Sequence, residues 1–393
     1  MAKEIKKTKS THVDSEIKSD REGLLSSLAD ELNKQYKDTG KVAFSLDDKE
    51  DASFITDWIS TGSSLLDLAI SNRAHGGLPV GRMVEITGLE SSGKSMMAAH
   101  IIANTQKKGG VAVMIDTENS AAPEFWRSLG VNTHKDYLVY IQHETVEDIF
   151  TTIEKAIASI RKTNSDILLT IIVDSVAAAT TKVELEGEHG KTGYATDKSI
   201  IISRAMRKIT NMIGKQKVLI VFTNQLRQNL KAMAFSDPWV VSGGKALAYH
   251  CSVRVRVNNV GKLKSDDRII GVECKGDVKK TRFGPGFRSA NFSIYFDSGI
   301  ADYASWIKIL KENNIIKQAG AYYKFTNIAG EEEQFQSKDF VGMMQSNKEL
   351  RESFYQQICD AVIMQYKDPN SVIVENATVD TEEDSAGAND ENA

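Results

Sequence analysis

The chain has 393 residues, of which 41% are hydrophobic and 26% charged, the balance of a globular protein with one large core domain and one or two small ones. No apolar run approaches the ~18 residues of a membrane helix, and the polar start MAKEIKKTKS does not resemble a secretory signal. Three widely spaced cysteines exclude a disulfide framework and a cysteine-based zinc site, and they favour a reducing, cytoplasmic location.

The net charge of −4 argues mildly against a nucleic-acid binder. However, residues 375–393 contain seven acidic residues and no Lys or Arg, so the rest of the chain is slightly positive. The placement of local charge therefore has more weight than the total.

The N-terminal region predicts one helix between two polar segments. Residues 1–19 are Lys-rich without periodicity, and we expect them to be disordered. Within residues 20–57, the run REGLLSSLADELNKQY places its leucines at helical spacing, which predicts an amphipathic helix followed by a linker. Such a helix must bury its apolar stripe on its own body or on a neighbouring molecule.

Residues 58–300 predict an α/β core. Apolar runs typical of buried parallel strands are RMVEITG, GVAVMID, YLVYIQ, DILLTIIVDS and KVLIVFTNQ. Helical runs between them are MMAAHIIANTQKK, VEDIFTTIEKAIASIRK and KSIIISRAMRKITNMIG. Three later strands, CSVRVRVNN, RIIGVECKG and ANFSIYFD, have no helices between them and predict an antiparallel extension of the sheet.

Residues 301–370 change to a helix, a short hairpin and a second helix, which predicts a small α+β domain. The acidic tail, residues 371–393, is expected to be disordered. The predicted fold is thus a P-loop ATPase core with a mixed, mostly parallel sheet, an N-terminal helix and a small C-terminal domain.

The run GLESSGKS, Gly88 to Ser95, has the spacing of a phosphate-binding loop and lies between a predicted strand and a predicted helix. Its glycines allow backbone N–H groups to approach phosphate oxygens at the positive end of the helix. Lys94 would contact the β- and γ-phosphates, and Ser95 would ligate Mg²⁺.

Two acids and an amide lie at the ends of the central strands. Asp174 ends the strand LLTIIVD and is expected to hold Mg²⁺ through water. Glu118 follows the strand GVAVMID, where a carboxylate can activate the attacking water, although the same residues fit a polar loop. Gln225 ends VLIVFTNQ, where its amide can donate to the γ-phosphate.

Two glycine-containing loops follow these strands. LRQNLKAMAFSDPWVVSGGK combines cations with large apolar side chains, which suits an unpaired nucleic-acid strand, although a mobile surface loop is the alternative. EGEHGKTGYATDK follows the Asp174 strand. Both are expected at the sheet edge that holds the γ-phosphate, so ligand on the loops could be coupled to nucleotide through Gln225.

Several blocks together resemble the bacterial RecA family of ATP-dependent homologous recombinases. They are ISTGSSLLDLAI, GGLPVGRMVEITGLESSGKS, VDSVAA, ELEGEHG, SRAMRK, NQLR and SGGKALAYHCSVRVRV, in the family's order from about residue 22 to 325. The divergent ends and loops are typical of a phage-encoded, RecA/UvsX-like member.

The resemblance implies roles for individual positions. Catalytic roles would belong to Glu118, Lys94, Gln225, Lys280 and Arg282. Nucleotide would contact Gly88, Glu90, Ser91, Ser92, Gly93, Lys94, Ser95 and Phe125, and metal would contact Ser95 and Asp174. DNA would contact Lys191, Tyr194, Lys198, Arg204, Arg207, Arg227, Lys231, Phe235, Trp239, Gly243, Gly244 and Lys245, in two loops at 188–197 and 226–243 and on the helix between them.

Lys280 and Arg282 lie where the family places two lysines that reach ATP on the adjacent subunit, which would make hydrolysis depend on assembly. Arg282 departs from that pattern but keeps the charge. Phe125 replaces a stacking Tyr, and Ala122 replaces an Asp near the adenine edge, which weakens the expected selectivity for ATP.

The implied function is DNA-stimulated ATP hydrolysis by a helical filament on single-stranded DNA that pairs with homologous duplex and exchanges strands. ATP and Mg²⁺ are the implied cofactors. Single-strand-binding and loader proteins are further expected partners, and no membrane is expected. The alternatives are a ring helicase of the same fold and an ATP-gated mediator that binds single strands with little turnover.

Overall fold

The computed structural model describes residues 23–37, 41–44, 55–119, 122–186, 194–214, 216–228, 239–241, 246–327 and 329–366. They form two compact units, Met1–Phe54 and Ile55–Ala393. In the first unit residues 23–35 are helical, as predicted. Asn33 joins this helix to the segment after it, because its Oδ1 accepts hydrogen bonds from the amides of Val42 and Ala43, both at 2.8 Å.

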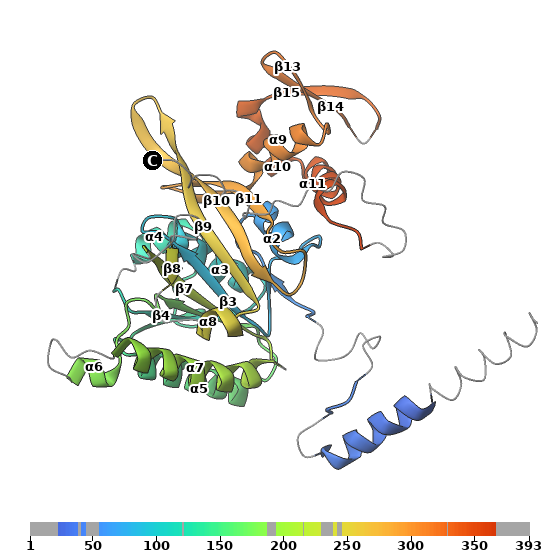
Figure 1. Ribbon diagram of the computed structural model, residues 1–393. Helices are drawn as coiled ribbons and strands as arrows, with labels where there is room; N and C mark the ends of the chain where they lie inside the picture. Colours follow the sequence, from blue (N-terminus) through green and yellow to red (C-terminus); the bar gives the residue numbers. More distant parts are fainter. Residues whose placement is uncertain are drawn as a thin grey trace, which may run out of the picture. The chain divides into compact units, whose positions relative to one another are not determined.

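A mixed central sheet organises the second unit (Figure 1). Its order is β12-β11-β10-β9-β3-β7-β6-β4-β5, with β8 paired to β7. The parallel strands are β3 (Met83–Gly88), β4 (Val111–Asp116), β5 (Leu138–Gln142), β6 (Leu169–Asp174) and β7 (Val218–Gln228). The predicted parallel strands are confirmed, so their carboxyl ends lie at one edge of the sheet.

Helices cover both faces of this sheet. One hydrophobic cluster joins the sheet to α2 (Ser64–Ser71) and α3 (Lys94–Lys107). The other joins it to α5 (Val146–Thr163), α7 (Tyr194–Ile213) and α8 (Ala246–His250). In β6, Ile172 points to the first cluster while Ile171 and Val173 point to the second, so an unbroken apolar strand serves both layers.

The antiparallel extension is longer than predicted. It comprises β9 (Val253–Ser265), β10 (Arg268–Thr281), β11 (Ser289–Tyr295) and the short β12 (Gly299–Ala301). Of β9, only Val253–Val257 pair with β3. The rest of the β9–β10 hairpin therefore continues beyond β3 (Figure 1). The alternating burial of β9 fades toward its exposed tip, which is why the sequence pattern underestimated the strand length.

The C-terminal part of this unit contains α9 (Asp302–Glu312), a three-stranded sheet, α10 (Phe340–Ser346) and α11 (Lys348–Val362). The sheet consists of β13 (Lys317–Ala319), β14 (Tyr322–Thr326) and β15 (Glu332–Gln336), followed by the 3-10 turn Ser337–Asp339. The predicted helix, hairpin and helix are confirmed. Their buried side chains join the cluster of α2 and α3, so this region packs on the core.

Short elements connect these parts, and they were not predicted. They are β1 (Trp58–Ile59), β2 (Leu78–Pro79), α4 (Pro123–Ser128), α6 (Lys182–Glu186) and β8 (Trp239–Val241). Among the described residues, no helix is long and apolar enough to span a membrane.

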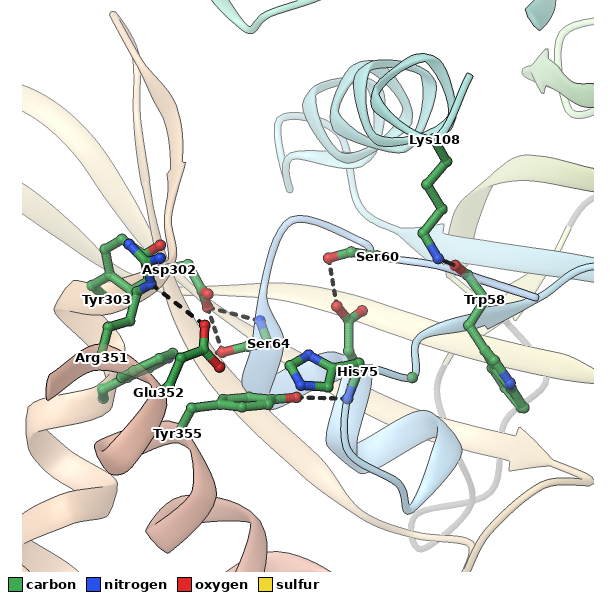
Figure 2. Close-up of a pocket in the computed structure, with 13 residues that line it drawn as sticks. Trp58, Ser60, Ser64, His75, Lys108, Asp302, Tyr303, Arg351, Glu352 and Tyr355 are labelled. Atoms are coloured by element: carbon green, nitrogen blue, oxygen red, sulfur yellow. Dashed lines mark hydrogen bonds and ion pairs between the residues drawn. The ribbon is translucent and has the colours of Figure 1, made fainter. Parts of the chain in front are cut away.

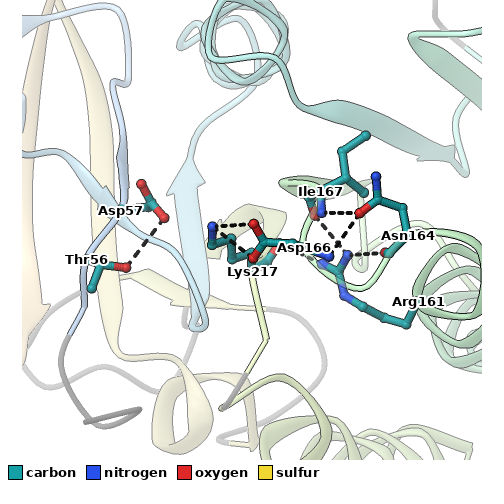
Figure 3. A network of polar contacts seen from close by, with 7 residues as sticks. All are labelled: Thr56, Asp57, Arg161, Asn164, Asp166, Ile167 and Lys217. Carbon is teal, nitrogen blue, oxygen red and sulfur yellow. Dashed lines mark hydrogen bonds and ion pairs between the residues drawn. The ribbon is translucent and has the colours of Figure 1, made fainter. Parts of the chain in front are cut away.

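A polar network closes the connection from α5 to β6 (Figure 3). The Arg161 guanidinium donates to the carbonyls of Asn164, Ile167 and Lys217 at 3.2, 2.8 and 2.9 Å. Lys217 also pairs with Asp166 at 3.0 Å. One side chain therefore satisfies carbonyls at the end of one helix and before two neighbouring strands, which fixes the sheet edge opposite the phosphate-binding loop.

Candidate functional site

The loop between β3 and α3 has the backbone of a phosphate-binding loop. Gly93 has φ +93°, and a Cβ there would lie 2.5 Å from the Ile294 Cδ1 atom. A Cβ at Gly88 would lie 2.3 Å from the Ser92 hydroxyl and 2.6 Å from the Val257 carbonyl oxygen. Glycine is therefore required at both ends of the loop.

The polar groups of this loop fit a bound polyphosphate. The Lys94 ammonium is nearly buried and donates to the Leu89 carbonyl at 2.7 Å and the Gly88 carbonyl at 3.2 Å. Burial lowers the pKa of Lys94, while the carboxylates of Asp174 and Glu118 act in the opposite direction. The buried Ser92 hydroxyl has no hydrogen-bond partner, as expected for a loop shaped to bind an anion.

Ser95 and Asp174 form the predicted metal pair. The Ser95 hydroxyl donates to Asp174 Oδ2 at 2.7 Å, and the Thr223 hydroxyl donates to Oδ1. Burial raises the pKa of Asp174, while these two hydrogen bonds lower it. No cluster of three or more His, Cys, Asp or Glu that could hold a metal occurs in the described part of the chain. A hydroxyl and a carboxylate beside a phosphate loop suit Mg²⁺, which takes its other ligands from phosphate and water.

Glu118 and Gln225 are brought together from different strands. Glu118 follows β4 and is exposed, and its Oε1 accepts from Gln225 Nε2 at 2.9 Å and from the Ser175 hydroxyl at 2.8 Å. Gln225 lies on β7 directly beside Gly88 in the parallel register. The carboxylate predicted as the base and the amide predicted as the γ-phosphate sensor therefore contact each other beside the phosphate loop.

Two residues that support Glu118 were not predicted. Asp116 ends β4 and accepts a hydrogen bond from the Glu118 amide at 2.8 Å and one from the Tyr140 hydroxyl at 2.8 Å. Desolvation and then the bond to Asp116 raise the pKa of Tyr140. The sequence shows both side chains, but only the β4–β5 register brings them together.

The other predicted nucleotide contacts lie on the loop and on α4. Glu90 and Ser91 are exposed on it, and Ser91 has φ +57°. Phe125 lies on α4 and packs against the α2–α3 hydrophobic cluster, and Ala122 caps that helix.

The predicted DNA contacts are only partly described. Outside the described residues lie Lys191, Lys231, Phe235, Gly243, Gly244, Lys245 and the side chain of Tyr194. Arg204 and Arg207 are exposed on α7, Arg227 is exposed on β7, and Trp239 is half-buried on β8. The acidic tail beyond residue 366 is likewise outside the description.

Lys198 does not lie on the surface as the DNA prediction required. It is buried on α7, and its ammonium donates to the carbonyls of Ala177 and Ala179. The predicted loop boundaries were also wrong in part. Helix α7 begins at Tyr194, and Leu226–Gln228 pair with Trp239–Val241, so each loop is shorter than the sequence indicated.

Lys280 and Arg282 lie far from the phosphate loop of their own chain. In the register, Lys280 is opposite Arg254, which is opposite Glu85, three residues before Gly88. At ~3.3 Å per residue and ~4.8 Å per strand, Lys280 is therefore about 10 Å from Gly88 along the strands and about 10 Å from it across the sheet. The Lys280 ammonium instead donates to the carbonyls of Ala248 and Tyr249 at 2.8 and 2.9 Å, and Arg282 is exposed.

A cavity of about 310 Å³ lies where α9 and α11 meet the start of the core (Figure 2). Asp67 accepts hydrogen bonds from the Thr61 amide at 2.9 Å, the Thr61 hydroxyl at 2.8 Å and the Ser60 hydroxyl at 2.5 Å. Asp302 accepts from the Ser64 amide at 2.7 Å and the Ser64 hydroxyl at 2.8 Å. Burial raises the pKa of Asp67 to about 7 and that of Asp302 to about 6. These acids lie at the joint and do not belong to the phosphate site.

Comparison with known proteins agrees with this geometry. Residues 25–301 match the family profile of the RecA N-terminal domain. The protein named Protein RecA of Dichelobacter nodosus is 37% identical over 301 residues, covering 77% of this chain and 81% of the relative. Protein RecA of Chlorobium limicola is 34% identical over 336 residues, covering 85% and 89%. Protein RecA of Clostridium acetobutylicum is 39% identical over 272 residues, covering 69% and 74%.

Proposed function

The chain belongs to the RecA family, and we propose that it is a DNA-dependent ATPase that forms a helical filament on single-stranded DNA. In this proposal the filament pairs its strand with homologous duplex and exchanges strands. Hydrolysis releases the DNA and does not drive the pairing.

The observation that carries the proposal is the hydrogen bond between Glu118 and Gln225. Glu118 would act as the base for the attacking water, and Gln225 lies on β7 directly before Leu226, where the second predicted DNA loop begins. A change in that loop would move β7 and with it the amide that holds the carboxylate. This contact offers a route by which DNA controls hydrolysis.

The residues of the phosphate loop have separate tasks in this mechanism. The Lys94 ammonium would exchange its two carbonyl partners for phosphate oxygens, and the backbone amides at the start of α3 would bind the rest of the charge. Ser95 and Asp174 would hold Mg²⁺, which neutralises charge on the β- and γ-phosphates when it is bound. Glu118 would take the proton of the water that attacks.

Lys280 and Arg282 would complete the site of an adjacent subunit. Their position near the opposite end of β3 prevents them from reaching their own phosphate loop. A cation supplied from a neighbour stabilises the negative charge that develops during phosphoryl transfer, so hydrolysis would require assembly.

The proposed partners are single-stranded DNA, homologous duplex DNA and further copies of the chain, with single-strand-binding and loader proteins acting before or during filament growth. Arg204 and Arg207 are exposed cations on α7, and Arg227 is an exposed cation on β7. Their contacts would be to phosphates, which leaves the bases of the bound strand available for pairing.

The test is ATP hydrolysis with and without long single-stranded DNA, measured beside a Glu118→Gln variant. Gln at position 118 keeps an oxygen that accepts from Gln225 and removes the base. We expect strong stimulation by DNA in the parent protein, and a loss of roughly a hundredfold or more in the variant. Strand exchange between homologous substrates is the second assay.

Three outcomes would contradict the proposal. DNA binding without hydrolysis would favour an ATP-gated mediator. Unwinding of a forked duplex that lacks homology would favour a ring helicase. Equal rates of ATP hydrolysis with and without DNA would show that the two predicted loops do not control the phosphate site.

A further inference from the structure

Asp116 is a bridge between the Glu118 backbone and the Tyr140 side chain. Its side chain is fully buried at the end of β4. Oδ1 accepts from the Glu118 amide at 2.8 Å, and Oδ2 accepts from the Tyr140 hydroxyl at 2.8 Å. Since the two oxygens of one carboxylate are held by these two donors, rotation of Asp116 would break both bonds together.

We propose that Tyr140 is a positioning residue that orients Glu118 through Asp116. The inference rests on the proposed function, because Glu118 acts as a base only if this chain hydrolyses ATP. A buried carboxylate requires donors, and loss of the Tyr140 hydroxyl leaves Oδ2 without its phenol donor. The carboxylate then reorients, and the Glu118 amide loses its fixed acceptor.

The strand register explains why a tyrosine on β5 can make this contact. Tyr140 is opposite Met114 in the parallel β4–β5 pair, and Asp116 is two residues further along β4 on the same side. The phenol ring remains 40% exposed, since β5 is the edge strand of the sheet. A phenylalanine therefore fits the same space, and the hydroxyl can be removed without a cavity in the core.

The other contacts of Glu118 do not replace this one. Gln225 and Ser175 both bind the Glu118 carboxylate, whereas Asp116 binds its backbone amide. The first two contacts hold the reacting atoms, and the third fixes the point from which the side chain extends. Loss of the third should misplace the carboxylate and lower kcat, with little effect on ATP binding.

The experiment compares Tyr140→Phe with Tyr137→Phe. Tyr137 precedes the same edge strand and is 44% exposed, so it controls for removal of a hydroxyl at this edge. Steady-state kcat and KM for ATP are measured at saturating single-stranded DNA. Hydrogen exchange of the Glu118 amide is measured by NMR in the nucleotide-free protein, where the readout does not depend on activity. Asp116→Asn and the variant that carries both Tyr140→Phe and Asp116→Asn complete a double-mutant cycle.

We expect Tyr140→Phe to lower kcat about tenfold with KM changed by less than about twofold, which corresponds to the loss of one hydrogen bond to a charged group. The Glu118 amide should exchange about tenfold faster, and Tyr137→Phe should match the parent protein in both measurements. The effects of Tyr140→Phe and Asp116→Asn should not add, because they act through one chain of contacts.

Unchanged kcat and unchanged exchange in Tyr140→Phe would overturn the inference and leave the proposed ATPase intact. A parent protein without DNA-dependent hydrolysis would instead refute the proposed function, while the exchange data would still decide whether Tyr140 holds Asp116 and Glu118. Additive effects in the cycle would show that Tyr140 acts by another route.

Discussion

The phosphate site and the cavity under α11 differ in how their polar groups are arranged. At the phosphate site, Lys94, Ser95 and Gln225 reach across an open loop to groups that a ligand could replace. In the cavity, Asp67 accepts hydrogen bonds from Thr61, Asp302 accepts them from Ser64, and aromatic side chains line the same pocket. Exchangeable contacts identify the site of chemistry here, whereas this pocket lies at a joint between packed elements.

The largest expected effect is a loss of nucleotide binding when Gly93 of the phosphate site is replaced. Gly93→Ala places a Cβ 2.5 Å from the Ile294 Cδ1 atom at φ +93°, so the positive φ strains the loop and either Ile294 or the loop must shift. Loss of two backbone hydrogen bonds to a charged ligand, each ~1.5–3 kcal/mol, should weaken nucleotide binding by at least about a hundredfold. Titration with a fluorescent ATP analogue measures this.

Gly109→Ala is the control for that change. Gly109 follows the other end of α3, has φ +78° and has open space around its Cβ. It carries the same backbone strain without a contact to the loop, so it should lose about 1 kcal/mol of stability and keep nucleotide affinity. If the two variants bind equally well, the loop geometry at Gly93 is not what binds the nucleotide.

The next effect concerns coupling within the phosphate site. Gln225→Ala removes the side chain that joins β7 to Glu118, so stimulation by single-stranded DNA should fall roughly tenfold or more while ATP still binds. Gln318→Ala, an exposed glutamine on β13 outside the phosphate site and the predicted loops, is the control. ATPase assays with and without DNA measure both. Full stimulation in Gln225→Ala would exclude this contact as the route.

The cavity is expected to respond to pH. The pKa of Asp67 is about 7 in the folded protein against 3.8 as the ordinary value, so the folded state binds the proton more tightly. Its contribution to stability is therefore complete below about pH 4 and is lost as the pH rises toward 7. Asp67→Asn mimics the protonated acid, because its amide can donate to Ser60 and its carbonyl can accept from Thr61.

Denaturant titrations at pH 5 and pH 8 measure this difference. At 1.36 kcal/mol per pKa unit, the parent protein should lose roughly 2 to 3 kcal/mol relative to Asp67→Asn over this interval. A constant difference between the two proteins would show that Asp67 is ionised in the folded state throughout.

The smallest effect is expected at the surface pair in Figure 3. Asp166 and Lys217 form a 3.0 Å ion pair, with 79% and 42% of their side chains exposed. Asp166→Ala should therefore change stability by less than about 1 kcal/mol, and the change should shrink at high salt. A larger loss would mean that Asp166 supports the Arg161 network more than its exposure indicates.

The local pattern of the sequence predicted the helices and strands of the core. It failed where pairing with a distant strand sets the length of an element. Runs rich in apolar residues identified β3, β4, β6 and β7, because strands buried on both faces need apolar side chains at most positions. The exposed parts of β9 and β10 lack that pattern, and their pairing with each other extends them. β8 is also set by its partner strand, so its three residues were taken as part of a loop.

The candidate site likewise combines residues that local spacing predicted with contacts that only the fold creates. Spacing alone identified Lys94 and Ser95, because the loop and its helix are continuous in the sequence. Glu118 and Gln225 were predicted by their places at strand ends, but their contact depends on three aligned strands. Lys198 was expected to contact DNA because of the resemblance, and only the fold shows that its ammonium donates to two backbone carbonyls. Tyr140 gave no signal because its partner lies on another strand.

The place of Lys280 and Arg282 has a consequence for how activity depends on the number of subunits. In the proposed filament each junction between neighbours completes one nucleotide site, so an array always has one fewer complete site than it has chains. Turnover per chain would then rise with array length and approach a limit. Short DNA that holds only a few copies would give a lower rate per bound chain than long DNA, even when every copy is bound.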